Sequence, residues 1–345
     1  MLKVGIIGAS GYTGAELARI LSLHPEMELV LATSRQYAGK SLATVYPHLQ
    51  QYRDVIFEDV EPAAMGERVD VVFTAVPHGT AMAAVPVLLA HGVKVVDLSA
   101  DFRIHDQQTF EKWYCPHTAV ALLPEAAYGL CELYRAEVKK ARLVANPGCY
   151  PTSVLLAVAP LLKNRLIDPA TLVVDAKSGA SGAGRGAKVG SLYCEVTEGF
   201  RAYNIGKHRH TPEIEQEVSL LAGCPVTLSF SPHLLPMSRG ILSTIYGVMA
   251  AGVTEDDIVS AFDAAYGDEP FVVFRGMDQL PATQEVRGSN RCHIGVVQDR
   301  RTGRIVVVSV IDNLVKGAAG QAVQNMNIMC GLPETMGLLQ QPLFP

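Results

Sequence analysis

The sequence predicts an α/β protein with a Rossmann-type, doubly wound parallel sheet and a second, α+β domain with a mixed sheet. Three observations predict it. An apolar strand at residues 3–7 runs into a glycine-rich loop and a helix. Apolar strands at 70–75 and 93–98 flank a helical segment at 81–90, which is the βαβ order of a covered parallel sheet. Two β-branched runs near the C-terminus are joined by a short turn, which indicates antiparallel pairing.

Bulk composition limits the classes of protein that remain. A chain of 345 residues favours two domains, and 49% hydrophobic with 18% charged residues is typical of a globular protein. A net charge of -5 argues against a nucleic acid or an anionic membrane surface as partner, and no apolar run approaches the roughly 18 residues of a membrane helix. Seven scattered cysteines without a Cys-x-x-Cys pair predict a reducing, cytoplasmic setting and no structural metal.

The first loop is a variant of the dinucleotide fingerprint. It follows a strand and opens a helix, the position in which glycines let a pyrophosphate approach the helix N-terminus. The alternative is a plain glycine turn that caps a helix. The predicted cofactor contacts in this loop are Gly8, Ser10, Gly11, Tyr12, Thr13 and Gly14.

The next strand, at residues 28–32, ends in Thr33, Ser34 and Arg35. Enzymes that use NAD usually carry an acidic residue here to hold the ribose 2′-hydroxyl. Hydroxyl groups and a guanidinium suit a 2′-phosphate instead, so we predict NADP(H), with Ser34 and Arg35 as cofactor contacts. The alternative is an ordinary exposed arginine at a strand end.

Cys149 is the predicted nucleophile. Residues 142–145 form a short strand, Pro147 and Gly148 force a turn, and Pro151 suits the first turn of a helix. A thiol at a helix N-terminus is favoured as the thiolate. Because ligands of parallel sheets bind beyond the carboxyl ends of the strands, the turns at 78–79, 99–103 and 146–149 should face one crevice, with Cys149 near the nicotinamide.

The second half contains two further polar motifs. The predicted strand 171–176 leads into a glycine-rich loop at 177–186, which is either an anion pocket or a flexible surface loop. Residues 207–213 hold two histidines and an arginine before a helix predicted over 213–221, with Thr211 as N-cap. Acid/base groups, anion binders, metal ligands and solvated residues are all possible, but no carboxylate or cysteine lies at a ligand-like spacing.

The remaining elements complete the second domain. A small-residue helix over 313–329 should return to the nucleotide-binding domain. This predicts that residues 1–148 plus 313–345 form the NADP-binding domain and 149–312 the catalytic and substrate domain. The other predicted elements are strands at 226–230, 240–249, 271–274, 293–298 and 305–311, and a helix from Thr254 to Tyr266.

Taken together, these motifs resemble the N-acetyl-γ-glutamyl-phosphate reductase family, NADP enzymes of arginine biosynthesis that are related to aspartate-β-semialdehyde dehydrogenases. The resemblance covers nearly the whole chain. It is carried by Gly8–Gly14, Ala75–Gly79, Asp97–Arg103, Asn146–Thr152, Ser178–Arg185, Lys207–Glu213 and Pro232–Leu234.

The resemblance implies an activity and a set of residues. Cys149 would attack the acyl phosphate and form a thioester, which hydride from NADPH then reduces to the semialdehyde. His208 or His210 would act as acid/base, and we favour His210, at the helix start. Further cofactor contacts would be Pro77, Ser178, Gly179 and Asn313. Substrate contacts would be Arg103, Asn146, Ser181, Arg185, Arg209 and Arg239.

The family resemblance also implies a homodimer or homotetramer, built through the sheet of the second domain. Two other functions stay open at this point. A sister reductase for aspartyl phosphate or an N-acetylaminoadipyl phosphate would share the same parts. An NADP-sensing binding protein with an inert Cys149 belongs to a different class.

Overall fold

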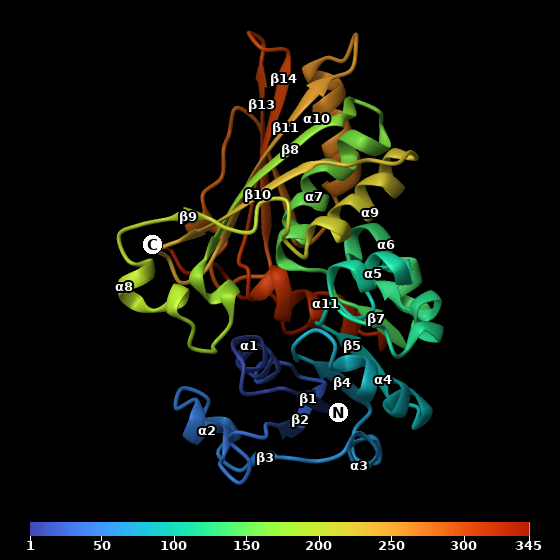
Figure 1. Cartoon of the computed structure of the whole chain (residues 1–345), viewed down its shortest axis with the longest axis vertical. Helices are drawn as coiled ribbons and strands as arrows, with labels where there is room; N and C mark the ends of the chain where they lie inside the picture. Colours follow the sequence, from blue (N-terminus) through green and yellow to red (C-terminus); the bar gives the residue numbers. More distant parts are fainter. Residues whose placement is uncertain (345) are drawn as a thin grey trace. The chain divides into compact units, whose positions relative to one another are not determined.

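The computed structural model describes residues 1–344, which fall into two compact units (Figure 1). One comprises Met1–Pro147 with Ala318–Leu339, and the other comprises Gly148–Gly317 with the chain from Gln340 on. The second break therefore falls five residues after the predicted boundary at 312. The end of the chain, predicted to belong to the first domain, lies with the second unit instead, because Leu343 N donates to Arg287 O at 2.8 Å. Pro345, also in that prediction, lies outside the described residues.

The first unit is built on a seven-stranded sheet whose strand pairs are all parallel. Its order is β3-β2-β1-β4-β5-β7-β6, so the winding direction reverses between β1 and β4. This is the predicted doubly wound arrangement. The switch point lies at the carboxyl end of β1, the strand that leads into the glycine-rich loop. The strands are β1 (Leu2–Ile7), β2 (Met27–Thr33), β3 (Phe57–Glu58), β4 (Val71–Thr74), β5 (Lys94–Asp97), β6 (Ala127–Tyr128) and β7 (Leu143–Ala145).

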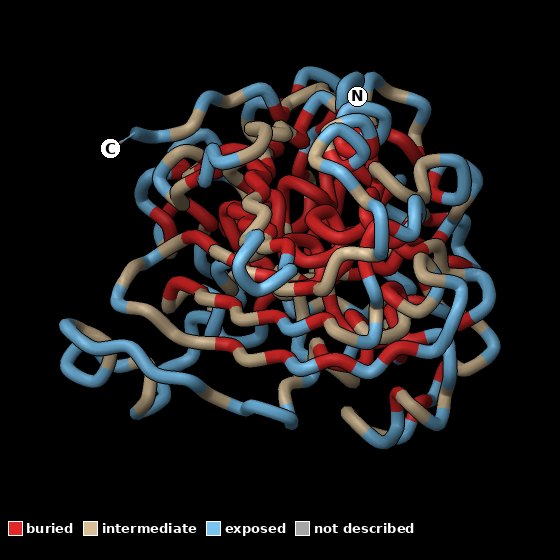
Figure 2. The backbone as a smooth tube through the Cα atoms, turned by 90° about the horizontal axis from the view of Figure 1, so that it is seen from above, coloured by how far each residue is buried: buried red, intermediate tan, exposed pale blue. Residues whose placement is uncertain are grey.

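Helices bury the apolar strands of this sheet. Leu31, Val72 and Val95 are fully buried in a core with Val85 and Leu88 of the fourth helix. In Figure 2 the buried residues lie on the central strands and helices, while exposed residues follow the outer loops. The helices of this unit are α1 (Tyr12–Leu21), α2 (Leu42–Val45), α3 (Pro62–Gly66), α4 (Ala81–Ala90), α5 (Gln107–Trp113), α6 (Cys131–Lys140) and α11 (Gly320–Met329).

The second unit contains a mixed sheet of seven strands in the order β12-β13-β14-β11-β8-β10-β9. β13 and β14 form the predicted antiparallel hairpin, whereas β8 and β10 pair in parallel. The predicted fold class is therefore confirmed for both units. The strands are β8 (Ile167–Gly179), β9 (Arg201–Ala202), β10 (Ser229–Leu235), β11 (Ile241–Met249), β12 (Val272–Met277), β13 (Cys292–Asp299) and β14 (Arg304–Ile311).

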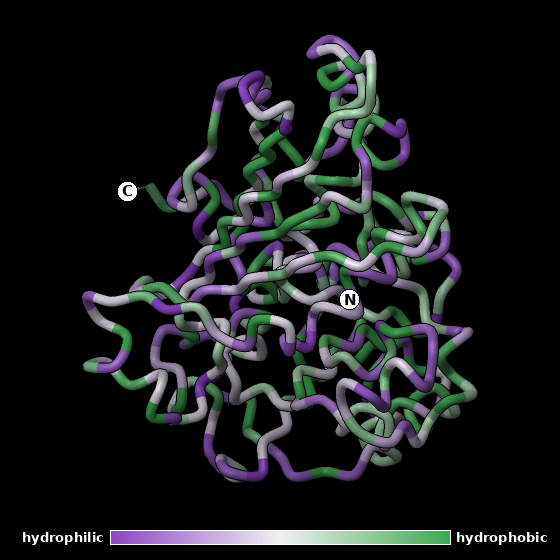
Figure 3. Tube along the Cα trace, turned by 45° about the horizontal axis from the view of Figure 1, so that its top comes forward, coloured by the Kyte–Doolittle hydropathy of each residue, from purple (hydrophilic) through white to green (hydrophobic). Residues whose placement is uncertain are grey.

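One face of this sheet is covered and the other is partly open. Along β8, Val174 and Ala176 are fully buried, while Val173 is 37% exposed and Asp175 and Lys177 are partly exposed. The buried face packs on α7 (Cys149–Lys163). Two further helices, α9 (Thr211–Ala222) and α10 (Glu255–Tyr266), pack on α7. The remaining helix, α8 (Tyr193–Val196), is short. Hydrophilic residues concentrate at the turns (Figure 3). No helix within residues 1–344 has the length and apolar composition needed to cross a bilayer.

Several predicted boundaries in the second unit are wrong by a few residues. β8 starts at Ile167 and continues to Gly179, because pairing with β10 and β11 extends it into the predicted loop. α9 begins at Thr211 with His210 as its N-cap, so Thr211 is the first helical residue and not the cap. α11 is preceded by a π-helical turn, η6 (Val315–Ala319), where one continuous helix was predicted.

Candidate active site

Cys149 is the first residue of α7, as predicted. Its N-cap is Gly148, which has no side chain to satisfy the first amides of this helix of 15 residues. The main-chain oxygen of Gly148 accepts hydrogen bonds from Thr152, from its N–H at 2.9 Å and its hydroxyl at 3.0 Å. Cys149 is partly exposed whereas Tyr150 and Pro151 are buried. The thiol therefore lies at the positive end of the helix dipole and is accessible to a ligand.

The N-terminus of a second helix meets that of α7. Gly148 N donates to Oε1 of Glu213 at 2.8 Å, and Glu213 is fully buried in the first turn of α9. Because His210 is the N-cap of α9, this bond also holds the histidine segment beside the start of α7. The bond joins residues 65 apart in the chain, so no local sequence pattern could predict this role of Glu213.

The two histidines lie in a cluster of aromatic rings. Ring centroids of His208 and His210 are 4.9 Å apart, and the Tyr150 ring lies 5.5 Å from His208 and 5.9 Å from His210. Tyr203 and Phe230 contact His208 from other sides, with centroids at 5.5 and 5.3 Å. His208 is thus enclosed by rings. This cage is not apparent in the sequence, because aromatic residues spread over three segments give no local pattern.

The geometry distinguishes the two histidines. Nδ1 of His208 accepts a hydrogen bond from His210 N at 3.1 Å. Burial, and then the charge of Arg209, lower the pKa of His208 to about 4. His208 is therefore neutral near pH 7, with its proton on Nε2. This arrangement favours His210 over His208 for proton transfer.

Two tyrosine hydroxyl groups lie within range of the Cys149 charge. The Tyr203 hydroxyl donates to that of Tyr150 at 3.2 Å, and Tyr150 donates to the main-chain oxygen of His233 at 3.3 Å. Burial, opposed by the hydrogen bond to Tyr150 and aided by the charge of Cys149, raises the pKa of Tyr203 to about 12. Burial also raises the pKa of Tyr150. Both hydroxyl groups therefore remain protonated, with their hydrogens directed at the Tyr150 oxygen and at His233 O.

The glycine-rich segment after β8 is tied to the start of the C-terminal segment. Asn313 Nδ2 donates to the Ser181 hydroxyl at 2.9 Å, and its Oδ1 accepts from Gly240 N at 2.8 Å. The main chain of residues 237–239 lies close to Gly179. A Cβ added at Gly179 would lie 2.9 Å from main-chain atoms of these three residues. Ser178, Gly179, Ser181, Asn313 and Arg239 are thus brought together, whereas Arg185 and Arg209 are exposed.

The three glycines of the first loop have different structural roles. Gly8 has φ +81° and a Cβ there would lie 2.4 Å from Ala75 O, so the turn requires glycine. Gly14 packs so closely that a Cβ would lie 2.5 Å from Ala9 Cα. A Cβ on Gly11, the N-cap of α1, would meet only Gly8 O at 3.7 Å, which leaves the helix N-terminus open to a phosphate. These residues fit a dinucleotide pyrophosphate.

Polar groups at the end of β2 lie beside this loop. The Ser34 hydroxyl donates to that of Ser10 at 2.9 Å, and Thr33 Oγ1 accepts from Gly8 N at 3.2 Å. The Arg35 side chain is 92% exposed. Its Nε lies 3.8 Å from Asp59 Oδ1, a loose ion pair that leaves the other guanidinium donors available. Of the other predicted contacts, Tyr12, Thr13 and Pro77 are exposed or partly exposed in the same unit.

Two predicted substrate contacts of the first unit have structural partners. Arg103 is 4% exposed; its Nε donates to Asn146 O at 2.7 Å and one Nη to Leu98 O at 2.7 Å. Asn146 is fully buried, and its Oδ1 accepts from Asn325 Nδ2 at 3.0 Å. These bonds link the turns that follow β5 and β7, so both residues are better suited to holding those turns than to holding a substrate.

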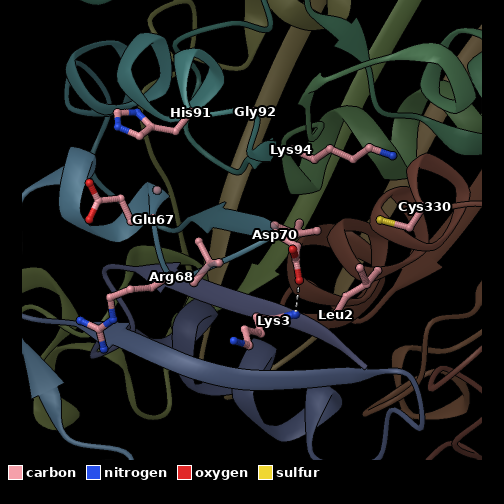
Figure 4. A pocket seen from close by; sticks show the side chains of 12 residues that line it. Leu2, Lys3, Glu67, Arg68, Asp70, His91, Gly92, Lys94 and Cys330 are labelled. Atoms are coloured by element: carbon pink, nitrogen blue, oxygen red, sulfur yellow. Dashed lines mark hydrogen bonds between the residues drawn. The ribbon is translucent and has the colours of Figure 1, made fainter.

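A cavity of about 490 Å³ lies at the opposite edge of this sheet (Figure 4). It is lined by the amino-terminal ends of β1, β4 and β5, with Lys3, Asp70 and Lys94 among its charged residues. Lys94 is used internally, because its ammonium donates to Met329 O. Burial raises the pKa of the lining Cys330. Because the cavity lies at the amino-terminal ends of the strands, it is separate from the predicted cofactor site at their carboxyl ends. No cluster of metal-binding residues occurs in the described part of the chain.

Comparison with known proteins accounts for both units. Residues 3–141 match a family model described as semialdehyde dehydrogenase, NAD binding domain, and residues 149–313 match its dimerisation domain. Among solved structures, aspartate semialdehyde dehydrogenase II of Vibrio cholerae aligns with a TM-score of 0.71 at 16% identity, covering 96% of this chain and 98% of that one. Aspartate semialdehyde dehydrogenase with NADP from Candida albicans aligns equally well, at 0.71 and 16%, with the same coverage.

Closer relatives match over the full length. N-acetyl-gamma-glutamyl-phosphate reductase of Geobacter sp. (strain M21) is 59% identical over 346 residues, covering 100% of both chains. The protein of that name from Syntrophobacter fumaroxidans is 54% identical over 345 residues, again with 100% of both chains covered. At this identity and coverage the chain belongs to the N-acetyl-γ-glutamyl-phosphate reductase family.

Proposed function

We propose that this chain reduces N-acetyl-γ-glutamyl phosphate to N-acetylglutamate semialdehyde with NADPH, releasing phosphate, as a step of arginine biosynthesis. The observation that carries the proposal is the meeting of two helix N-termini, Cys149 opening α7 and His210 capping α9, linked by the bond from Gly148 to Glu213. A thiolate and a nearby histidine are what acyl transfer from a phosphate leaving group requires.

The residues of the second unit account for the first half of the reaction. His210 accepts the thiol proton, and Cys149 Sγ attacks the acyl carbon. The carbon–oxygen bond to phosphate breaks, and His210 passes its proton to the departing phosphate oxygen. The acyl group is left as a thioester on Cys149. General acid/base catalysis of this kind contributes roughly 10²–10⁴-fold.

The second half returns the enzyme to its starting state. When bound, NADPH supplies the hydride that reduces the acyl carbon. The resulting alkoxide re-forms a carbonyl, the carbon–sulfur bond breaks, and Cys149 leaves as a thiolate that the α7 N-terminus stabilises. The semialdehyde departs and one solvent proton replaces the one taken by phosphate. The Tyr150 and Tyr203 hydroxyl groups stay protonated, and therefore uncharged, in the region where the charge on sulfur develops.

A single measurement tests the mechanism and the substrate. Enzyme mixed with the acyl phosphate in the absence of NADPH should release a burst of about one phosphate per active site. Intact mass should show an added acyl group that maps to Cys149 and not to Cys194 or Cys224, although both of these are exposed. The added mass separates an N-acetylglutamyl group from an aspartyl or aminoadipyl one.

The matched control for the burst is Cys149→Ser, which keeps the volume but is a far weaker nucleophile at neutral pH. It should bind NADPH and show neither burst nor adduct. Normal turnover of the native enzyme without any adduct would contradict covalent catalysis. NADPH binding without turnover of any acyl phosphate would instead favour a sensor.

We also propose that two copies associate through the open face of the second sheet, giving a homodimer or a homotetramer. This face presents Val173, Leu242 and Tyr246, all partly exposed, on adjacent strands of the domain that matches the dimerisation model. A specific interface buries about 1,600 Å² in total. Val173→Arg should therefore shift the mass measured by sedimentation towards the monomer, and an unchanged mass would place the interface elsewhere.

The cytoplasm is the proposed location. No disulfide joins the seven cysteines, all of which lie within the described residues. An exposed Cys194 or Cys224 would be a liability in an oxidising compartment, and the proposed nucleophile must stay reduced. Cell fractionation that followed this chain with a cytoplasmic marker would test the assignment.

A further inference from the structure

A π-helical turn separates β14 from α11 and is fixed at its start. Asp312 Oδ1 accepts from Leu314 N at 2.8 Å and Val315 N at 3.2 Å, and Gly317 N donates to Asp312 O at 3.0 Å. Behind this turn the second carboxylate oxygen of Asp312 accepts from Gly288 N at 2.7 Å. π-Helical turns are rare and frequently occur at functional sites.

Gly317, in the middle of η6, lies directly against the nucleophile. A Cβ added at Gly317 would lie 2.8 Å from Cys149 Cβ and 3.3 Å from Cys149 Cα. It would also lie 3.2 Å from Cδ1 of Ile311, at the end of β14. Gly317 is not among the glycines with positive φ. Space, and not backbone conformation, is therefore what requires glycine at this position.

The close contact falls on atoms that cannot easily move. Cys149 Cβ is attached directly to the main chain at the start of α7, and that start is held by the bond from Gly148 N to Glu213. On the other side, Asp312 holds the π-helical turn. A side chain at residue 317 would have to displace one of these fixed segments. Movement of Ile311 Cδ1 could relieve the contact at 3.2 Å, but not the closer one at 2.8 Å with Cys149 Cβ.

We infer that Gly317 is a positioning residue for Cys149. Its bare Cα lets η6 pack against the first turn of α7, which fixes Cys149 Cβ and leaves rotation about χ1 as the main freedom of the thiol. The catalytic consequence rests on the proposed function, but the contact itself does not. An active-site displacement of about 1 Å can cost on the order of 10² in rate.

The first test is Gly317→Ala in the full-length protein. We expect kcat to fall on the order of 10²-fold, with NADPH affinity changed by less than about 3-fold, because the added methyl displaces Cys149 and not the nucleotide loop. The matched control is Gly247→Ala in β11, where an added Cβ would make only ordinary contacts at 3.6 and 3.7 Å. That control should retain activity. Equal kcat in Gly317→Ala and native enzyme would overturn the inference.

A second test measures the contact without measuring activity. Cys149→Gly removes the Cβ that Gly317→Ala would strike, so the two changes form a double-mutant cycle read out by thermal or denaturant unfolding. We expect Gly317→Ala to destabilise the native protein more than it destabilises Cys149→Gly. If Gly317→Ala does not fold by itself, the double variant should fold. Additive effects, or failure of both to fold, would mean that the conflict lies elsewhere. The phosphate burst of the native enzyme is independent of this result, so failure of the proposed function would be recognised separately.

Discussion

The carboxylate of Glu213 accepts the main-chain N–H of Gly148 at 2.8 Å, one residue before the nucleophile. This bond spans the gap between two helices that are far apart in the chain. It satisfies one of the amides that a glycine N-cap leaves without a side-chain acceptor. It also brings the carboxylate close to the α7 N-terminus. Glu213 therefore fixes where Cys149 begins its helix.

Removing that carboxylate should affect stability and rate together. Glu213→Ala leaves a buried N–H without an acceptor, which should cost about 1–3 kcal/mol in the free energy of unfolding and lower kcat. Glu213→Gln keeps an acceptor oxygen and should recover most of the stability. Denaturant unfolding and steady-state kinetics on both variants check this. Equal stability for the alanine and glutamine variants would show that the hydrogen bond does not hold the turn.

Arg35 should determine the choice between the two nicotinamide cofactors. Its side chain is 92% exposed beside Ser34 at the end of β2. Arg35→Ala should weaken NADPH binding by roughly tenfold or more and leave NADH nearly unchanged, because only NADPH offers a 2′-phosphate for a charge-assisted bond. Titration of protein fluorescence with each cofactor measures the two dissociation constants. A matched loss for both cofactors would exclude a contact with the 2′-phosphate.

His210 should carry the proton-transfer role. His210→Asn should lower kcat by roughly 10²–10⁴-fold, because the proton acceptor is lost. NADPH binding should stay intact, because residue 210 lies outside the nucleotide loop. Stopped-flow measurement of the phosphate burst would show whether acylation is the step that slows. A larger loss in His208→Asn than in His210→Asn would exchange the two roles, and no effect of either would point to another base such as His233.

Much of the fold follows from local pattern, and the site follows only partly. Strands such as β4 and β14 are short apolar runs bounded by turns, and the predicted segment at 81–90 coincides with α4. The short helix α5 and the kinked helix α6 were missed, because α6 is polar and interrupted at Tyr134. Cys149 could be identified from its local turn. Periodicity contains no information on pairs that are distant in the chain.

The arginines illustrate that limit. An arginine beside a predicted crevice is a reasonable candidate for a carboxylate or phosphate, and Arg103 and Arg35 are equivalent by that criterion. Folding buries Arg103 on the main-chain oxygen of Asn146, 43 residues away, and leaves Arg35 exposed. Close approach is equally invisible, since nothing in the run around Gly317 indicates that Cys149 lies within van der Waals distance of it.

The neutral state of His208 predicts a specific dependence of stability on pH. Burial, and then Arg209, lower its pKa in the folded protein to about 4, below the ordinary value of 6.5. Between these two values the unfolded chain binds more protons than the folded one, so stability falls as the pH is lowered from about 7 towards 4. In His208→Asn the amide oxygen can still accept from His210 N, but no proton is taken up on unfolding. The free energy of unfolding of that variant should therefore decline less than that of the native protein over the same range, as measured by urea denaturation at pH 7.5, 6 and 5. Carboxylates elsewhere titrate in both proteins and cancel in the difference. Parallel pH curves for the two proteins would mean that His208 titrates alike in the folded and unfolded chains, and its exclusion from proton transfer would lose its support.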